Sequence, residues 1–203
     1  VSPPSWHLGH TTWFFETLIL KQFLKGYKPF DDKFPYYFNS YYESLGQRLE
    51  RSNRGGLTRP SLESVYEYRA YVDEHMQKLL QKQPGGKMAK LLEPGLNHEQ
   101  QHQELFLTDF KCILANQPFY PVYDENFSEG KALAEQNEFI SFEEGLYQIG
   151  HEGDSFAYDN EEPRHRVFLE NFEIAQRLVT NAEWLEFIED GGYQSFKYWH
   201  SDG

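Results

Sequence analysis

Hydrophobic and polar positions recur with a helical period through much of the first 115 residues. From Pro4 to Leu24, apolar and aromatic side chains return at spacings of three and four, which predicts one helix. A second helix is expected to begin at Ser61, a residue type suited to N-capping, and its apolar positions are Val65, Tyr68, Val72, Met76 and Leu79. A third is expected from about Met88 to Ala115, with Pro94-Gly95 as a kink or break.

The pattern changes between and after these helices. Residues 25–44 are rich in Tyr, Phe, Pro and Asp without a sustained period, so a loop packed by its aromatic side chains is expected. Residues 118–136 combine Pro, Gly, Asn and acidic residues, which indicates a linker. Short strands are then expected at 146–150, 164–170 and 172–175. A last helix should follow, capped by Thr180 and Glu183 and ending near Gly191.

This order of elements indicates an α+β chain of two domains. Residues 1–117 form the helical domain, 118–136 the linker, and 137–203 the beginning of a mixed domain. The chain begins without Met inside an apparent helix start and stops after few strands, so we expect a fragment of a longer polypeptide. In such a truncated domain four aromatic side chains would lack packing partners, namely Phe168, Phe172, Trp184 and Trp199.

Charge and composition narrow the class of partner. A net charge of −13 and a pI near 5.0 repel phosphate backbones and anionic membranes, so small-molecule partners are expected rather than nucleic acid or membrane. No apolar run approaches the roughly 18 residues that cross a bilayer, and the first residues do not have the pattern of a signal peptide. The single cysteine, Cys112, excludes an internal disulfide and suits a cytoplasmic protein.

The stretch NHEQQHQE at 97–104 places two histidines four residues apart in the third predicted helix. His98 and His102 therefore lie on one helix face, as in a chelate. His10 lies on the aromatic face of the first predicted helix, which a bundle would bury. One metal shared by three buried rings would satisfy their nitrogens, whereas the plainer alternatives are a solvated His pair and a hydrogen-bonded core His10. Three imidazoles suit iron(II) or zinc, and the residues alone leave that choice open.

Two longer motifs resemble one known family. The segment SWHLGHTTWFFE, followed far downstream by HEQQHQE, resembles the iron-binding DinB-like helical domain of the hercynine oxygenases, or sulfoxide synthases, of ergothioneine biosynthesis. The segment from GLYQIGHEG onward resembles the start of the formylglycine-generating-enzyme (sulfatase-modifying factor) domain that follows in the same family. The resemblance implies a DinB-like four-helix bundle, its first helix partly missing here, and then a truncated C-type-lectin-like mixed domain.

The resemblance also implies roles for particular residues. The ligands of a non-haem iron(II) would be His10, His98 and His102. Gln101 matches a glutamine that contacts the substrate imidazole, although an isolated glutamine is more often a solvated amide. Arg51 and Arg54 match an arginine pair that binds the carboxylate of the sulfur donor, or are only surface charge. The family's catalytic tyrosine would lie beyond residue 203, so residues 1–203 should bind metal without turnover.

The activity implied is an O2-dependent formation of a carbon–sulfur bond. Hercynine (Nα-trimethylhistidine) and a thiol, either cysteine or γ-glutamylcysteine, would give a sulfoxide. Three alternatives stay open: a DinB-like S-transferase that activates a thiol with zinc or nickel, an ovothiol-type enzyme that accepts histidine, and a protein that only binds a ligand. Among nearby residues, His7 is expected to cap or pack, and Asp159, Glu161 and His165 to belong to an acidic turn rather than a metal site.

Overall fold

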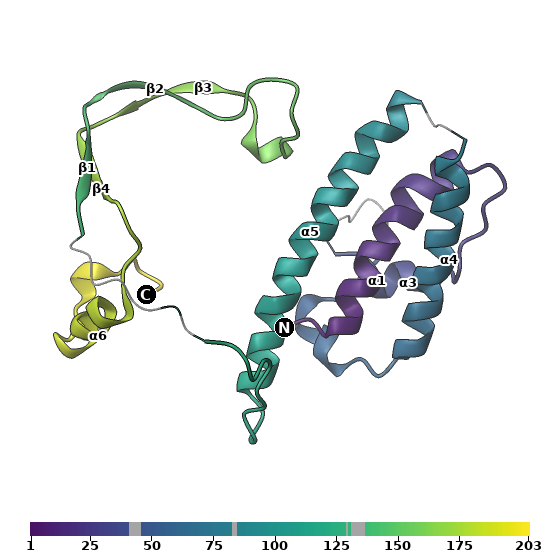
Figure 1. Ribbon diagram of the computed structural model, residues 1–203, viewed down its shortest axis with the longest axis horizontal. Helices are drawn as coiled ribbons and strands as arrows, with labels where there is room; N and C mark the ends of the chain where they lie inside the picture. Colours follow the sequence, from purple (N-terminus) through teal and green to yellow (C-terminus); the bar gives the residue numbers. More distant parts are fainter. Residues whose placement is uncertain (41–45, 83–84, 129, 131–136) are drawn as a thin grey trace. The chain divides into compact units, whose positions relative to one another are not determined.

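The computed structural model describes residues 1–40, 46–82, 85–128, 130 and 137–203. These residues form two compact units, Val1–Asn126 and Phe127–Gly203. The first unit is helical, and the second combines short strands with helices (Figure 1). The predicted boundaries of the helical domain at 117 and of the linker at 118–136 stay predictions.

The first unit is built on three long helical segments. Helix α1 runs into a π-helical turn and the short α2, and it packs against both α4 and α5 (Figure 1). The elements of this unit are α1 (Pro4–Phe15), the π-turn (Glu16–Leu20), α2 (Lys21–Phe23), α3 (Phe34–Phe38), a 3-10 helix (Arg51–Gly56), α4 (Leu62–Leu80) and α5 (Gly86–Ala115). Because the described residues contribute three long segments and the short α3, the four-helix bundle remains a prediction.

The helices begin much as the sequence predicts. The Ser61 side chain accepts a hydrogen bond from the backbone N–H of Ser64 at the start of α4. Of the kink or break expected at Pro94-Gly95, the break is wrong, because α5 is a single helix through these residues. Gly95 lets α5 lie close to α1, since a Cβ there would lie 2.9 Å from Cε1 of Phe15. The close packing of α5 on α1 compensates the backbone hydrogen bond that Pro94 cannot make.

The aromatic loop prediction holds in part. Phe34–Phe38 forms the short helix α3, which the sequence did not predict, and residues 41–45 lie outside the described part. Pro35 in its first turn favours a helix start, because its fixed φ suits that position. Phe30, Phe34 and Phe38 gather around Tyr68 of α4, with ring centroids 5.3, 5.0 and 6.1 Å away. The aromatic packing is therefore confirmed.

A buried carboxylate lies in the core beside these rings. Glu16, in the π-turn, is fully buried. It accepts hydrogen bonds from the hydroxyls of Tyr27 and Tyr68, each at 2.7 Å, and from the backbone N–H of Phe30 at 2.9 Å. Burial and the Glu16 carboxylate raise the pKa of both phenols, so they remain donors. Glu16 thus ties α1 to α4 and to the loop before α3.

The second unit contains two antiparallel ladders. Strand β1 (Phe139–Phe142) pairs with β4 (Phe172–Ala175), and β2 (Gly145–Ile149) pairs with β3 (His165–Leu169). Three strands match the prediction, whereas β1 was missed. Helix α6 (Asn181–Glu189) has the predicted capping box of Thr180 and Glu183, and Gly191 follows it with a φ of 77°.

The expected exposure of aromatic side chains is confirmed at three of the four positions. Phe168, Phe172 and Trp184 are 56%, 40% and 46% exposed, although Phe172 stacks on Phe142 with ring centroids 4.8 Å apart. Trp199 instead stacks on Tyr193 at 5.2 Å between ring centroids, and its indole N–H donates to the carbonyl of Gly192. None of the described helices combines the length and the apolar character that a membrane span requires.

Candidate metal centre

Three histidines converge between α1 and α5. His10 lies on α1, and His98 and His102 lie one turn apart on α5. One ring nitrogen from each lies within 4.8 Å of the other two. The Nε2 atoms of His10 and His98 are 3.1 Å apart, and the ring centroids are separated pairwise by 4.6 to 4.9 Å. The structure therefore brings together the three residues that the sequence predicts as ligands.

The orientation of His10 is set by its second nitrogen. Nδ1 lies 2.5 Å from the carbonyl oxygen of Phe38, which can only accept, so Nδ1 carries the proton. Nε2 is then a lone pair directed at His98. Gly9 makes this approach possible, because a Cβ at that position would lie 2.2 Å from Cε1 of Phe38.

Aromatic and cationic groups cover the His10 ring. Trp6 stacks on it with centroids 4.6 Å apart and planes at 11°, and Trp13 stacks at 5.7 Å. The Arg54 guanidinium lies 3.6 Å from the centre of the Trp6 ring, a cation–π arrangement. Arg54 also donates to the hydroxyls of Ser2 and Ser40. A positive charge is thus held beside the three histidines.

The surroundings keep the imidazoles neutral. Burial is the main cause that lowers the pKa of His10 well below its ordinary value, and the neighbouring histidines and Arg54 lower it further. The pKa of His102 falls to about 3, mainly through burial and then through His98 and His7. Burial also lowers the pKa of His98. Neutral imidazole is the form that ligates metals.

The donor set fits a divalent transition metal. The cluster that the described residues form contains three imidazoles and neither thiolate nor carboxylate. Nδ1 of His98 is buried, and no partner for it occurs in the described part of the chain. Three neutral nitrogens that face one another suit iron(II) or zinc and leave other coordination positions open.

His102 has a neighbour that the sequence did not reveal. Its Nδ1 lies 3.0 Å from Nδ1 of His7 on α1, and Nε2 of His7 lies 3.1 Å from Oδ2 of Asp109 on α5. All three side chains are buried. His7 was expected to cap or pack, and it does pack against Trp6 and Phe106, but its hydrogen bonds tie α1 to α5. The one signal in the sequence was that Asp109 lies seven residues after His102, on the same face.

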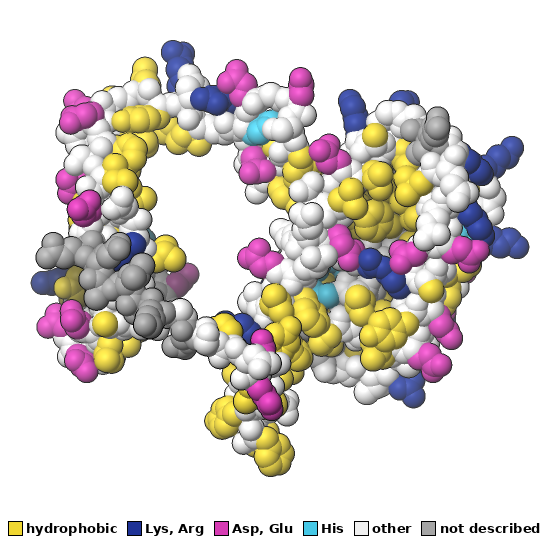
Figure 2. All heavy atoms as spheres, in the orientation of Figure 1, with side chains coloured by type: hydrophobic (Ala, Val, Ile, Leu, Met, Phe, Trp, Pro, Cys, Tyr) yellow, Lys and Arg dark blue, Asp and Glu magenta, His cyan; other side chains and the backbone are white. Residues whose placement is uncertain are grey.

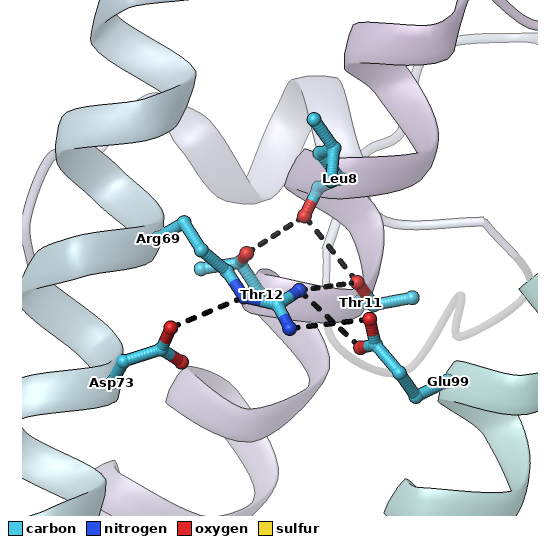
Figure 3. Close-up of polar contacts among 6 residues, drawn as sticks. All are labelled: Leu8, Thr11, Thr12, Arg69, Asp73 and Glu99. Atoms are coloured by element: carbon cyan, nitrogen blue, oxygen red, sulfur yellow. Dashed lines mark hydrogen bonds and ion pairs between the residues drawn. The ribbon is translucent and has the colours of Figure 1, made fainter. Parts of the chain in front are cut away.

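A polar cluster beside the histidines links all three long helices (Figure 3). Arg69 of α4 forms a two-pronged ion pair with Glu99 of α5, at 3.1 and 3.3 Å, and donates to Thr11 of α1 at 3.1 Å. It also pairs with Asp73, one turn along α4. Since Glu99 directly follows His98, this cluster restricts the rotation of α5 about its axis.

The residues predicted to bind substrate lie in different surroundings. Gln101 is exposed on α5, and Arg51 is exposed at the start of the 3-10 helix. Arg54 is buried beside Trp6, and the pKa of His7 is lowered mainly by burial and further by the charges of Arg54 and Arg51. Their contact with substrate stays a prediction.

His7 and His102 border a cavity. A mostly apolar cavity of about 510 Å³ lies among α1, α4 and α5, and Figure 2 shows hydrophobic side chains gathered over these helices. Its lining includes His7, Thr11, Tyr66, His102 and Phe106.

The acidic segment before β3 forms a short 3-10 turn, Asp159–Glu161. Glu161 accepts from the backbone N–H of Tyr158, and Nδ1 of His165 faces the carbonyl of Pro163. Within the described residues, the groups able to share a metal do not include Asp159, Glu161 or His165.

Comparison with known proteins finds a family match for the second unit. Residues 125–202 match the sulfatase-modifying factor enzyme 1-like domain. The chain therefore combines a helical unit that carries a three-histidine cluster with a domain of the sulfatase-modifying-factor type.

The curated relatives are hercynine oxygenases. The chain is 49% identical over 47 residues to the hercynine oxygenase of Mycolicibacterium smegmatis, and 48% over 48 residues to that of Mycolicibacterium thermoresistibile. It is 45% identical over 47 residues to that of Mycobacterium tuberculosis. These matches cover 23 to 24% of this chain and 11% of each relative's length. The chain is thus similar to hercynine oxygenases over a short stretch.

Proposed function

We propose that this chain supplies the metal centre of a hercynine oxygenase, an iron(II)- and O2-dependent enzyme of ergothioneine biosynthesis. The observation that carries the proposal is the convergence of three neutral imidazoles, each offering a nitrogen within 4.8 Å of the others. The similarity to hercynine oxygenases and the sulfatase-modifying-factor domain support the choice of reaction.

The substrates would be hercynine and a thiol, either cysteine or γ-glutamylcysteine. One hydrogen leaves the imidazole carbon and one leaves the sulfur as the carbon–sulfur bond forms. The sulfur then takes one oxygen atom of O2, and the other oxygen leaves as water. Formation of the carbon–sulfur bond and formation of the sulfoxide each remove two electrons. Together they supply the four electrons that reduce O2.

His10, His98 and His102 would hold the iron through one nitrogen each. Iron(II) at this position would supply a Lewis acid for the thiolate and a one-electron reductant for O2. Burial keeps the imidazoles neutral, so at neutral pH no proton competes with the metal for the free nitrogen of each ring.

Arg54 is the better placed of the two arginines to balance a substrate carboxylate near the site. Its guanidinium is held over Trp6, which itself stacks on His10. A carboxylate bound by Arg54, with Arg51 further out, would bring the thiol toward the histidines. Gln101, one turn along α5 from His98, would contact the imidazole of hercynine.

The test is an oxygen-uptake assay on the gene product that carries these residues, loaded anaerobically with iron(II). We expect O2 consumption only when hercynine and the thiol are both present, with the sulfoxide detected by mass spectrometry. His98→Ala should abolish turnover, whereas His75→Ala, on α4 and outside the cluster, should leave it unchanged.

Other outcomes would overturn the proposal. Thiol transfer without O2 in zinc-loaded protein would identify an S-transferase. A strong preference for histidine over hercynine would identify an ovothiol-type enzyme. Fully loaded protein that consumes no O2 with either acceptor would contradict an oxygenase of this kind.

A further inference from the structure

The three-histidine cluster has a buried extension on the far side of His102. His102 uses its Nδ1 to face Nδ1 of His7 at 3.0 Å, which leaves its Nε2 for the cluster. His7 in turn faces Asp109 with its Nε2 at 3.1 Å. His102, His7 and Asp109 are only 8%, 6% and 7% exposed, so bulk water does not compete for these contacts.

The positions of the protons along this chain of contacts follow from the carboxylate. An ionised carboxylate only accepts, so Nε2 of His7 carries a proton and donates to Asp109. The same oxygen, Oδ2, also accepts from the backbone N–H of Ser2 at 2.8 Å, which holds the Asp109 side chain in place. In a neutral His7 the other nitrogen, Nδ1, is then a lone pair.

That lone pair determines the tautomer of His102. Two Nδ1 atoms 3.0 Å apart need one proton between them, and His7 can only accept it. His102 therefore carries its proton on Nδ1, and its Nε2 is the free lone pair. A metal ligand whose other nitrogen donates to a fixed acceptor is held in the correct tautomer and orientation.

We propose that His7 and Asp109 are positioning residues that hold His102 in the tautomer whose Nε2 binds the metal. The inference rests on the proposed metal centre and adds two residues to it that do not touch the metal. It also separates the three ligands by their support. His10 has the Phe38 carbonyl, His102 has the His7–Asp109 pair, and for Nδ1 of His98 the described structure holds no partner.

The first test needs no metal. Long-range ¹H–¹⁵N spectra of the metal-free protein at pH 7 report the tautomer of each histidine ring, and His102→Gln assigns the His102 signal. We expect His102 to be protonated at Nδ1 in the wild type, and to shift toward Nε2 protonation or a mixture in His7→Phe. A wild-type His102 protonated at Nε2 would overturn the proposal.

The second test measures affinity for iron(II) under anaerobic conditions. His7→Phe keeps the ring but removes both nitrogens, and Asp109→Leu removes the acceptor. Each should weaken binding by about 10- to 100-fold, the usual effect of losing the partner of a ligand. Asp109→Asn can keep an oxygen at the same place and should remain within about 3-fold of wild type. His75→Phe, the same change on α4, should have no effect.

The two tests separate this inference from the proposed function. If Asp109→Leu fails to fold, the wild-type tautomer and the His7→Phe affinity still decide the matter. Normal iron affinity in His7→Phe would overturn the positioning role even if the enzyme turns over. A correct tautomer and a weakened His7→Phe would support it even if hercynine proves not to be the substrate.

Discussion

The carbonyl oxygen of Phe38 lies 2.5 Å from Nδ1 of His10. The two come this close because the neighbouring Gly9 has no side chain that would keep α1 and α3 apart. This contact determines which nitrogen of His10 faces the other histidines. The short helix α3 therefore bears directly on the proposed metal centre, through one backbone carbonyl and the Phe38 ring packed on Gly9.

Gly9→Ala should weaken metal binding. The new Cβ would lie 2.2 Å from Cε1 of Phe38, so the Phe38 ring must shift. We expect α3 to move with it and carry its carbonyl away from His10. We expect a loss of about 1–3 kcal/mol in the free energy of unfolding, measured by urea denaturation, together with weaker iron(II) affinity. The matched control is Gly86→Ala in α5, where a Cβ meets nothing within 4 Å. Equal behaviour of the two variants would contradict this account of Gly9.

Glu16→Ala should destabilise the helical unit strongly. It removes the acceptor of two phenols and one backbone N–H from a fully buried position, which should cost about 3–5 kcal/mol. Glu16→Gln keeps an oxygen for two of these donors and should cost about 1–2 kcal/mol. Urea denaturation curves of the wild type and the two variants give both changes in the free energy of unfolding. Glu67→Ala, exposed on α4, should change stability by less than about 0.5 kcal/mol.

Acid should destabilise the metal-free protein. The pKa of His7, His10, His98 and His102 is lower in the folded chain than the ordinary 6.5, so the unfolded chain takes up protons first. Their contribution is complete above pH 6.5 and is lost as the pH falls through the folded values, about 3 for His102. Each imidazole adds a slope of about 1.4 kcal/mol per pH unit within its window.

The measurement is the urea midpoint of the apoprotein between pH 7 and pH 4.5. His102→Gln, which lacks one of these imidazoles, should show a shallower decline than the wild type. A wild-type midpoint that stays constant or rises on acidification to pH 5 would show that the histidines are not held neutral.

The two arginines should differ in their effect on the thiol substrate. Arg54 is buried over Trp6, whereas Arg51 is exposed. Arg54→Gln should raise KM for a thiol that carries a carboxylate by about 10-fold or more, because a charge-assisted pair in a buried place is lost. Arg51→Gln should raise it less. Steady-state kinetics with varied thiol at saturating hercynine would reveal the opposite order if the assignment is wrong.

Local patterns in the sequence predicted much of the fold. The spacing of apolar residues gave α4 and α5, and Ser61 and Thr180 marked two helix starts correctly. A kink or break was expected at Pro94, and the break does not occur, because the packing of α5 on α1 around Gly95 outweighs the local preference of proline. Strand β1 was missed because the acidic and polar segment before it indicates a linker up to residue 136, and its pairing with β4, about 30 residues further along, has no local signal.

The candidate site also has a part that the sequence predicts and a part that only the packed structure reveals. The i, i+4 spacing of His98 and His102 is visible in the sequence, and the aromatic face of α1 singled out His10. The contact of His7 with His102 depends on how α1 and α5 are rotated against each other, which follows from packing of the whole unit. The role of the Phe38 carbonyl was equally hidden, because a backbone oxygen carries no sequence signature.

The most direct test of the metal centre is an anaerobic titration of the purified protein with iron(II), with bound metal counted per chain. The account predicts one ion per chain in the wild type and in His75→Ala. It predicts binding at least about 100-fold weaker in His10→Ala, His98→Ala and His102→Ala, with the helical circular dichroism unchanged. Wild-type affinity in any of these three variants, or no iron bound by the wild type, would contradict the three-histidine centre.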